Sequence, residues 1–463
     1  MFFERIKTPG IAHVAYVLAD DGDAALVDPR RDVEQYLDVL NENGLTLRYV
    51  LETHRQEDFE MGGAALRRLI GAKIVAGDHE NFAHADIRLS EGEEVQLGGL
   101  KLRGLHTPGH TPESMCYAVF LADSPEHAWG VFTGDALFVG DTGRTDLADA
   151  DKTAENAGVL YDVVHGKVFP LGDQAHVFPA HGAGSVCGGN VADRDHSTIG
   201  IERASNAAAV MTRDAFVRHK VHERVARPPY FTLMEEVNRE AGRPLDERPV
   251  SWLQPAQFQE RCRDGIVIDT RDPEAFAGGH LPGSYSIWLE GLGRYGGWLP
   301  SQAPIYLIVN GPAELVEAHL ALARIGRDDI AATVAGGFEA WRDAGLPIEM
   351  SGTIVPQGLK AASNQYTVLD VREISEFEDE GHIRNARHIF VGELEKWLGE
   401  SGLEKDAPLV VTCSVGHRGS LGTSILRRNG YLNVFNLLGG MTAWRKLQFP
   451  VEKGPIATPA PVG

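Results

Sequence analysis

The second half of the chain carries the same sequence pattern twice. Val267-Ile-Asp-Thr-Arg271 matches Val368-Leu-Asp-Val-Arg372, and Gly336-Gly-Phe-Glu-Ala-Trp341 matches Gly439-Gly-Met-Thr-Ala-Trp444. The offset is 101 residues between the aspartates and 103 between the tryptophans. A period of about a hundred exceeds the roughly 20 to 50 residues of solenoid repeats, so it indicates a duplicated domain.

Each copy alternates short apolar runs with stretches typical of helices. In the second copy, residues 408–412 are typical of a buried strand and residues 419–429 of the helix that follows it. This alternation favours a parallel α/β sheet. We expect the first copy over residues 248–350, the second over 351–454, and a loose Pro/Ala-rich tail over 455–463.

Cys413 lies between the predicted strand and helix of the second copy. Backbone N–H groups and the helix dipole favour an anion there, so the thiolate of Cys413 is a usable nucleophile. Arg418 adds positive charge and follows after only four intervening residues. This loop is tighter than that of cysteine-dependent phosphatases and resembles the loop of rhodanese-type sulfurtransferases. The resemblance implies a persulfide on Cys413 and a substrate-binding loop made of Ser414, Val415, Gly416 and His417.

The first copy resembles the same fold but lacks the loop chemistry. Asn310 stands where Cys413 does, and Leu315 stands where Arg418 does. Glu314 brings a negative charge to a place that should be positive. This copy is expected to carry no sulfur and to act as a spacer or docking module.

Residues 1–200 form a different domain, joined to the repeats by a polar helical connector over 201–247. Four polar motifs in it each follow a strand-like run, and they centre on His54, His110, Asp135 and His181. Loops at strand ends along one edge of a sheet can converge into a metal site. The motifs, in this order, resemble the metallo-β-lactamase superfamily, which implies an αββα sandwich ahead of the two rhodanese-like α/β domains.

The first motif departs from the superfamily pattern. That pattern reads His-x-His-x-Asp-His and supports two metals, whereas here Gln56 and Phe59 stand where two of the histidines belong. Gln is a poor transition-metal ligand and Phe is none. A two-metal hydrolase of the usual kind is therefore disfavoured.

The retained residues are His54, His110 and Asp135. Two histidines and one carboxylate form a facial triad that suits non-haem Fe(II). One superfamily branch uses this triad, the persulfide dioxygenases, which oxidise a low-molecular-weight thiol persulfide to sulfite. The resemblance implies one Fe(II) per chain, with zinc as the alternative metal. Gln56, Asp58 and His181 would then be hydrogen-bonding supports of the ligands.

Residues 140–146 resemble the Gly-Arg-Thr-Asp segment of that branch, in which the arginine contacts the anionic substrate. Arg144 is the corresponding residue. The whole chain resembles bacterial fusions of a persulfide dioxygenase with a sulfurtransferase. This implies a thiol persulfide, sulfite and thiosulfate as substrates or products and a dimer or larger assembly. Glutathione, coenzyme A and bacillithiol persulfides fit Arg144 equally well.

Two other functions stay open at this point. One is a metal-dependent hydrolase of the same superfamily, with zinc. The other is a decayed metal domain that acts as a scaffold for the sulfurtransferase.

Composition excludes some partners. The chain has 44 Lys and Arg against 65 Asp and Glu, a formal net charge of −21, which disfavours nucleic acid and anionic membranes. We expect no secretory signal, because residues 1–10 lack an apolar core, and no membrane span. The four widely spaced cysteines are typical of cytosolic thiols, so a cytoplasmic protein is expected.

Overall fold

The computed structural model describes residues 1–189, 191–246, 248–300 and 303–455. These residues form two compact units. Residues 1–246 together with 323–326 make the first, and the remaining described residues make the second. Apart from residue 455, the predicted tail lies outside the described residues.

Two sheets packed face to face form the centre of the first unit. The first has the order β1 (Phe2–Thr8), β2 (His13–Asp20), β3 (Asp23–Val27), β4 (Thr46–Leu51), β5 (Lys73–Gly77), β6 (Ile87–Leu89). The second has the order β11 (His176–Pro179), β10 (Ser124–Gly134), β9 (Met115–Leu121), β8 (Leu100–His106), β7 (Glu94–Leu97). Inward-facing apolar side chains such as Tyr16 and Phe132 fill the space between them.

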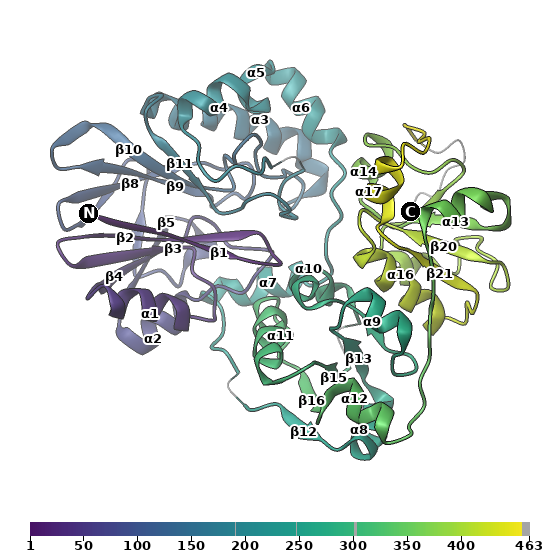
Figure 1. Cartoon of the computed structure of the whole chain (residues 1–463). Coiled ribbons are helices and arrows are strands. Elements are labelled where there is room, and N and C mark those ends of the chain that lie inside the picture. Colours follow the sequence, from purple (N-terminus) through teal and green to yellow (C-terminus); the bar gives the residue numbers. More distant parts are fainter. Residues whose placement is uncertain (190, 247, 301–302, 456–463) are drawn as a thin grey trace. The chain divides into compact units, whose positions relative to one another are not determined.

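Helices cover the outer faces of both sheets (Figure 1). On the first sheet they are α1 (Glu34–Glu42) and α2 (Gly63–Ile70); on the second they are α3 (Thr153–Val163), α4 (Ile199–Ser205), α5 (Ala207–Val210) and α6 (Arg213–His222). Tyr36 and Leu66 anchor the first layer, and Leu160 and Phe216 anchor the second. The predicted αββα sandwich is confirmed.

Part of the predicted connector contributes to this sandwich. Phe216 of α6 is fully buried in the same core as Leu160 of α3. The connector continues with α7 (Phe231–Val237), whose Phe231 and Met234 are also buried. Burial of these apolar side chains ties the connector to the first unit.

The second unit contains two five-stranded sheets with the same strand order. The first sheet runs β12 (Ser251–Leu253), β16 (Ile330–Val334), β15 (Ile305–Ile308), β13 (Ile266–Asp269), β14 (Tyr285–Ser286). The second runs β17 (Gly352–Ile354), β21 (Val434–Leu437), β20 (Leu409–Thr412), β18 (Thr367–Asp370), β19 (Arg387–His388). All neighbouring strands are parallel. The predicted duplication and the parallel α/β class are confirmed.

Each sheet carries its own set of helices. Those of the first copy are α8 (Pro255–Arg261), α9 (Pro273–Gly278), α10 (Leu292–Tyr295), α11 (Pro312–Arg324) and α12 (Gly337–Asp343). Those of the second copy are α13 (Pro356–Ala361), α14 (Ile374–Glu378), α15 (Leu394–Trp397), α16 (His417–Arg428) and α17 (Gly440–Lys446). None of the helices among the described residues is both long enough and apolar enough to cross a bilayer.

The first copy packs against the helix that carries the cysteine loop of the second. The hydroxyls of Ser286 on β14 and Ser420 on α16 lie 2.7 Å apart. The backbone N–H of Ser286 also donates to the hydroxyl of Ser424, at 3.1 Å. These buried hydrogen bonds hold α16 against the copy that has no loop cysteine.

Candidate functional site

Loops at the ends of four strands bring His54, His110, Asp135 and His181 together. They follow β4, β8, β10 and β11, and all four side chains are buried. Asp135 lies at the centre. One of its carboxylate oxygens is 3.4 Å from His110 Nε2 and 3.9 Å from His54 Nε2, and the other is 3.6 Å from His181 Nε2. The residues singled out from four separate motifs therefore form one cluster.

Hydrogen bonds fix the orientation of the two triad imidazoles. His110 Nδ1 is 2.8 Å from the carbonyl oxygen of Arg144, which can only accept, so Nδ1 carries a proton. His54 Nδ1 is 2.9 Å from the hydroxyl of Thr53, and that hydroxyl donates to Asp28 at 2.8 Å. The Thr53 oxygen therefore accepts from His54. In both rings Nε2 is the atom left to face Asp135.

The converging atoms fit a metal ion. His54 Nε2, His110 Nε2 and both Asp135 oxygens are buried and have no hydrogen-bond partner among the described residues. An unpaired buried polar atom costs about 1–3 kcal/mol, so native structures rarely keep several side by side. Two imidazole nitrogens and a carboxylate aimed at one point are the donor set of a 2-His-1-carboxylate metal site.

Glu57 adds a carboxylate that the sequence analysis did not single out. Its Oε2 is 3.5 Å from His110 Nε2 and 3.8 Å from His54 Nε2, and this oxygen is also unpartnered among the described residues. Glu57 follows His54 by three positions in the same loop. This spacing is the sequence signal for Glu57, because it places a carboxylate three residues after the first ligand histidine.

Gln56 and Phe59 occupy the two altered positions in different ways. The Gln56 amide nitrogen lies 3.4 Å from His54 Nδ1, beside the ring rather than at its metal-facing atom. The Phe59 ring packs on the ring of His13, with centroids 4.1 Å apart. An apolar ring thus fills the place of the missing imidazole, and buried His13 is a neighbour that sequence reasoning missed.

A second set of donor atoms lies on the other side of Asp135. Asp58, His181 and Cys187 are all buried, and one ligand atom from each lies within 4.8 Å of the other two. Asp58 Oδ2 is 3.6 Å from His181 Nδ1. The sequence predicts hydrogen-bonding roles for Asp58 and His181. In the structure both carboxylate oxygens of Asp58 and both ring nitrogens of His181 lack a partner among the described residues.

The buried acidic side chains of the pocket favour binding of a cation. Burial raises the pKa of Asp135 to about 8 despite the opposing effect of His110. Burial, then the charges of Asp135 and Glu57, raise the pKa of Asp58 well above its usual range. Burial alone would lower the pKa of His110, but the charge of Asp135 and the contact with Glu57 outweigh it and raise that pKa to about 9. The Asp135 carboxylate and the His110 imidazole therefore each favour the charged form of the other.

The Arg144 side chain bonds to other residues of the protein in this structure. Its guanidinium makes a bidentate pair with Asp146, with both contacts at 2.7 Å, and donates to three backbone carbonyls, those of Val186, Val225 and Ala226. Its backbone N–H donates to the carbonyl of Cys187 at 2.9 Å. Arg144 therefore links the Cys187 loop to His110. Its contact with substrate stays a prediction.

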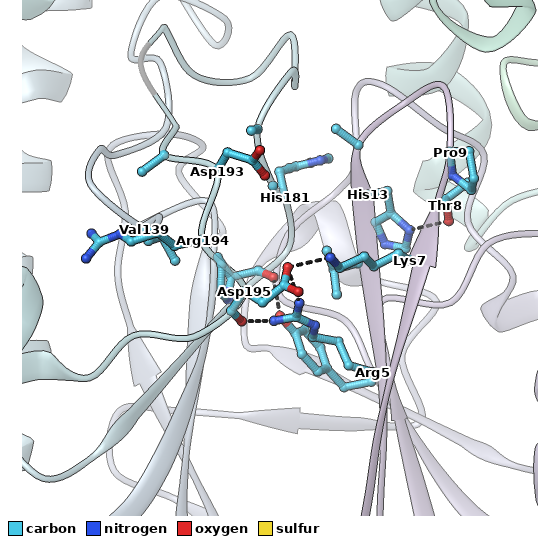
Figure 2. Close-up of a pocket in the computed structure, with 17 residues that line it drawn as sticks. Arg5, Lys7, Thr8, Pro9, His13, Val139, His181, Asp193, Arg194 and Asp195 are labelled. Atoms are coloured by element: carbon cyan, nitrogen blue, oxygen red, sulfur yellow. Dashed lines mark hydrogen bonds and ion pairs between the residues drawn. The ribbon is translucent and has the colours of Figure 1, made fainter. Parts of the chain in front are cut away.

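An open cavity of about 230 Å³ has His181 and His13 in its wall (Figure 2). Arg5, Lys7 and Arg194 also line it, and Asp195 pairs with Arg5 at 2.8 Å and with Lys7. His13 and His181 are themselves fully buried, so they form part of the cavity's inner wall.

The cysteine loop of the second unit lies between β20 and α16. Cys413 follows β20 and is buried, and the backbone N–H of Gly416 donates to its sulfur at 3.1 Å. Gly416, at φ 118°, makes the sharp turn that starts α16 at His417. The sulfur therefore accepts a hydrogen bond from a backbone N–H at the start of a helix, a position that favours a thiolate or a persulfide anion.

Arg418 is held by a residue that sequence reasoning missed. Its guanidinium contacts the Glu376 carboxylate at 2.5 and 2.8 Å, and the Ser414 hydroxyl at 2.6 Å. Burial raises the pKa of Glu376, but the hydrogen bonds and charge of Arg418 outweigh burial and hold that pKa at about 2. Glu376 thus anchors Arg418 and Ser414 at the base of the loop.

The rest of the loop differs in exposure. The His417 ring stacks on Trp288 of the first copy, with centroids 4.7 Å apart and planes 19° apart. Val415 is exposed and is the outermost of the predicted substrate-binding residues.

In the first copy, the backbone N–H and side-chain amide of Asn310 donate to Glu314, at 2.8 and 2.9 Å. The Glu314 carboxylate therefore accepts the hydrogen bonds of this loop, which has no cysteine.

The chain resembles known proteins along most of its length. The metallo-beta-lactamase superfamily model matches residues 8–181, and the rhodanese-like domain model matches residues 254–344 and 355–447. Persulfide dioxygenase ETHE1, mitochondrial, of Homo sapiens is 30% identical over 234 residues, which cover 49% of this chain and 83% of that protein. The Mus musculus counterpart is 28% identical over 249 residues, covering 52% of this chain and 89% of that protein. A crystal structure of a metallo-beta-lactamase from Staphylococcus aureus subsp. aureus COL has a TM-score of 0.64 at 28% identity, covering 72% of this chain and 98% of that one.

Proposed function

We propose that this chain, which belongs to the persulfide dioxygenase family of the metallo-beta-lactamase superfamily and carries two rhodanese-like domains, joins two sulfur reactions. The first oxidises a low-molecular-weight thiol persulfide with O₂ and water to the thiol and sulfite. The second moves a sulfane sulfur on Cys413. Sulfite links the two, because it is the product of the first reaction and an acceptor for the second.

The first reaction rests on one observation, the unpartnered Nε2 atoms of His54 and His110 converging on the free oxygens of Asp135. Held by these three residues, one Fe(II) would supply the binding and activation of O₂. Thr53 and the Arg144 carbonyl keep the two imidazoles in the ligating tautomer. The burial of the cluster excludes bulk water from the reacting atoms.

The second reaction takes place in the loop around Cys413. Its thiolate attacks the outer sulfur of a donor such as a thiol persulfide, which forms a Cys413 persulfide and releases the donor thiolate. Sulfite then attacks the outer sulfur, forms thiosulfate and restores the Cys413 thiolate. The N–H of Gly416 and the start of α16 stabilise the anion before and after transfer.

Two substitutions separate the halves experimentally. In the iron-loaded full chain supplied with glutathione persulfide, Asp135→Asn should abolish oxygen uptake and keep thiosulfate:cyanide sulfurtransfer. Cys413→Ser should keep oxygen uptake and abolish thiosulfate:cyanide sulfurtransfer. Oxygen uptake that survives Asp135→Asn would overturn the assignment of the metal centre. Sulfurtransfer that survives Cys413→Ser would overturn that of the loop.

A further inference from the structure

Asn436 is a buried polar residue on β21, the strand next to the one that ends at the cysteine loop. Its side-chain amide nitrogen donates to the carbonyl oxygen of Gly416 at 3.0 Å. The backbone N–H of Gly416 donates in turn to the sulfur of Cys413 at 3.1 Å. Gly416 therefore connects the Asn436 side chain to the atom that would carry sulfur.

The Gly416 carbonyl is bonded from two directions. The backbone N–H of Ser420, in the first turn of α16, donates to it at 2.9 Å, and Asn436 uses the second lone pair of the same oxygen. Gly416 has a φ of 118°, which residues with a side chain rarely adopt. Because glycine is free to take other conformations, the bond from Asn436 restrains a peptide that would otherwise rotate.

The neighbouring carbonyls of the loop are bonded by backbone groups. Those of Cys413 and Ser414 accept from the N–H groups of Met441 and Thr442, at 2.8 and 2.9 Å. Among these donors to the loop carbonyls, Asn436 is the one that uses its side chain, so a single substitution can remove its bond.

The Asn436 amide is retained at a cost to the fold. Its Oδ1 is buried and has no hydrogen-bond partner among the described residues, which costs about 1–3 kcal/mol. Its neighbours on β21, Val434 and Leu437, are buried and apolar. A side chain that breaks the local pattern at such a cost indicates a role at a functional site.

The helix after the loop makes room for this side chain. A Cβ atom added to Gly419 would collide with the Asn436 amide. The glycine in the first turn of α16 therefore lets Asn436 reach Gly416.

The first copy has no such amide at the matching position. With the 103-residue offset of the Gly-Gly segments, Thr333 on β16 corresponds to Asn436. Its hydroxyl donates to the carbonyl of Leu307, within its own sheet, at 2.9 Å. The copy in which Asn310 replaces the cysteine thus also replaces the residue that restrains the loop.

We propose that Asn436 is a positioning residue for sulfur transfer. By holding the Gly416 carbonyl, it keeps the Gly416 N–H directed at the Cys413 sulfur, where the N–H stabilises the thiolate and the persulfide anion. The proposal rests on the proposed sulfur-carrying role of Cys413.

The test compares Asn436→Leu with wild type in the full chain. Alkylation of Cys413 by iodoacetamide is followed across pH by mass spectrometry of its peptide, and thiosulfate:cyanide sulfurtransfer and urea unfolding are measured beside it. Loss of one hydrogen bond to the anion should move the alkylation profile about one unit to higher pH and lower kcat/KM for sulfurtransfer about 10-fold. The free energy of unfolding should not fall, because the unpartnered oxygen is removed as well.

Thr423→Val is the matched control. Thr423 is buried on α16 and its hydroxyl also has no partner among the described residues. This variant should keep the wild-type alkylation profile and sulfurtransfer.

An alkylation profile that is unchanged in folded Asn436→Leu would overturn the proposal, whatever happens to stability, because a purely structural role does not act on the sulfur. Should Asn436→Leu fail to fold, Asn436→Thr, which introduces the residue of the first copy, is measured in the same way. Alkylation needs no turnover. A wild-type chain without sulfurtransfer would therefore refute the role of Cys413, while the shift between wild type and variant still decides the role of Asn436.

Discussion

The carbonyl oxygen of Arg144 lies 2.8 Å from Nδ1 of His110. Through this contact the Gly-Arg-Thr-Asp segment sets which nitrogen of His110 faces Asp135. The same segment reaches the Cys187 loop through the backbone N–H of Arg144. Arg144 therefore orders the metal pocket through its backbone, whatever its side chain does with substrate.

Thr53→Val should weaken iron binding. The variant removes the oxygen that accepts from His54 Nδ1, so the imidazole loses its orientation and a buried N–H is left unsatisfied. Loss of such a support typically lowers metal affinity about 10- to 100-fold. Competition with a chelator measures the affinity. Thr107→Val is the matched control, because its buried hydroxyl bonds Cys116 instead and its loss should leave iron affinity unchanged.

Glu57→Gln should also reduce iron affinity, by about 10-fold or more, because it removes a buried negative charge 3.5 Å from His110 Nε2. The same chelator competition measures it. Glu91→Gln, which removes a charge paired with Lys167 on the surface, should have no effect. Equal affinities for Glu57→Gln and wild type would mean that Glu57 plays no part in holding the metal.

The Glu376–Arg418 pair should make the second unit sensitive to acid. The usual pKa of Glu376 is 4.5 and its folded value is about 2, so its ion pair contributes fully above about pH 4.5 and is lost as pH falls through about 2. Urea unfolding of the full chain should show about 1–3 kcal/mol more stability at pH 7 in wild type than in Glu376→Gln. The difference should shrink toward pH 2.

Glu380→Gln is the control for this pair. The Glu380 carboxylate is exposed and pairs with Arg445 at 2.9 Å and with Arg372 at 3.8 Å, contacts that together contribute about 1 kcal/mol or less. If Glu376→Gln and Glu380→Gln have equal free energies of unfolding at pH 7, the Glu376 contact contributes no more than a surface salt bridge.

Restoring a thiol to the first copy should not restore its chemistry. In a Cys413→Ser background, Asn310→Cys places a thiol in a loop that Glu314 closes. The nearby carboxylate disfavours a thiolate, so thiosulfate:cyanide sulfurtransfer should stay absent. Activity regained by Asn310→Cys alone would show that the charge at Glu314 is not what disables this copy.

Much of the fold could be predicted from sequence, because it rests on local patterns. The repeat around Asp269 and Asp370 predicted two parallel sheets, and both form with the same strand order. The strand before Cys413 and the helix after it were also predicted, since apolar runs and loop residues mark them. Packing of Phe216 into the sandwich was not predicted, because a burial partner 56 residues away at Leu160 leaves no local pattern.

The candidate site was predicted less completely. Motif order identified His54, His110 and Asp135, which the structure brings together. Glu57 and Glu376 were missed, because their contacts with His110 and Arg418 join separate loops. No spacing in the sequence encodes the 2.5 Å contact between Glu376 and Arg418, whose positions are 42 residues apart.

The ratio of oxygen consumed to sulfite formed is the decisive measurement for the proposed dioxygenase. The full chain is stripped of metal, reloaded with Fe(II) or with Zn²⁺, and supplied with glutathione persulfide. We expect one O₂ to be consumed for each sulfite, in proportion to bound iron, and no uptake with zinc alone. Iron-loaded chain that consumes no oxygen, or zinc-loaded chain that hydrolyses a thioester instead, would rule out the proposed dioxygenase.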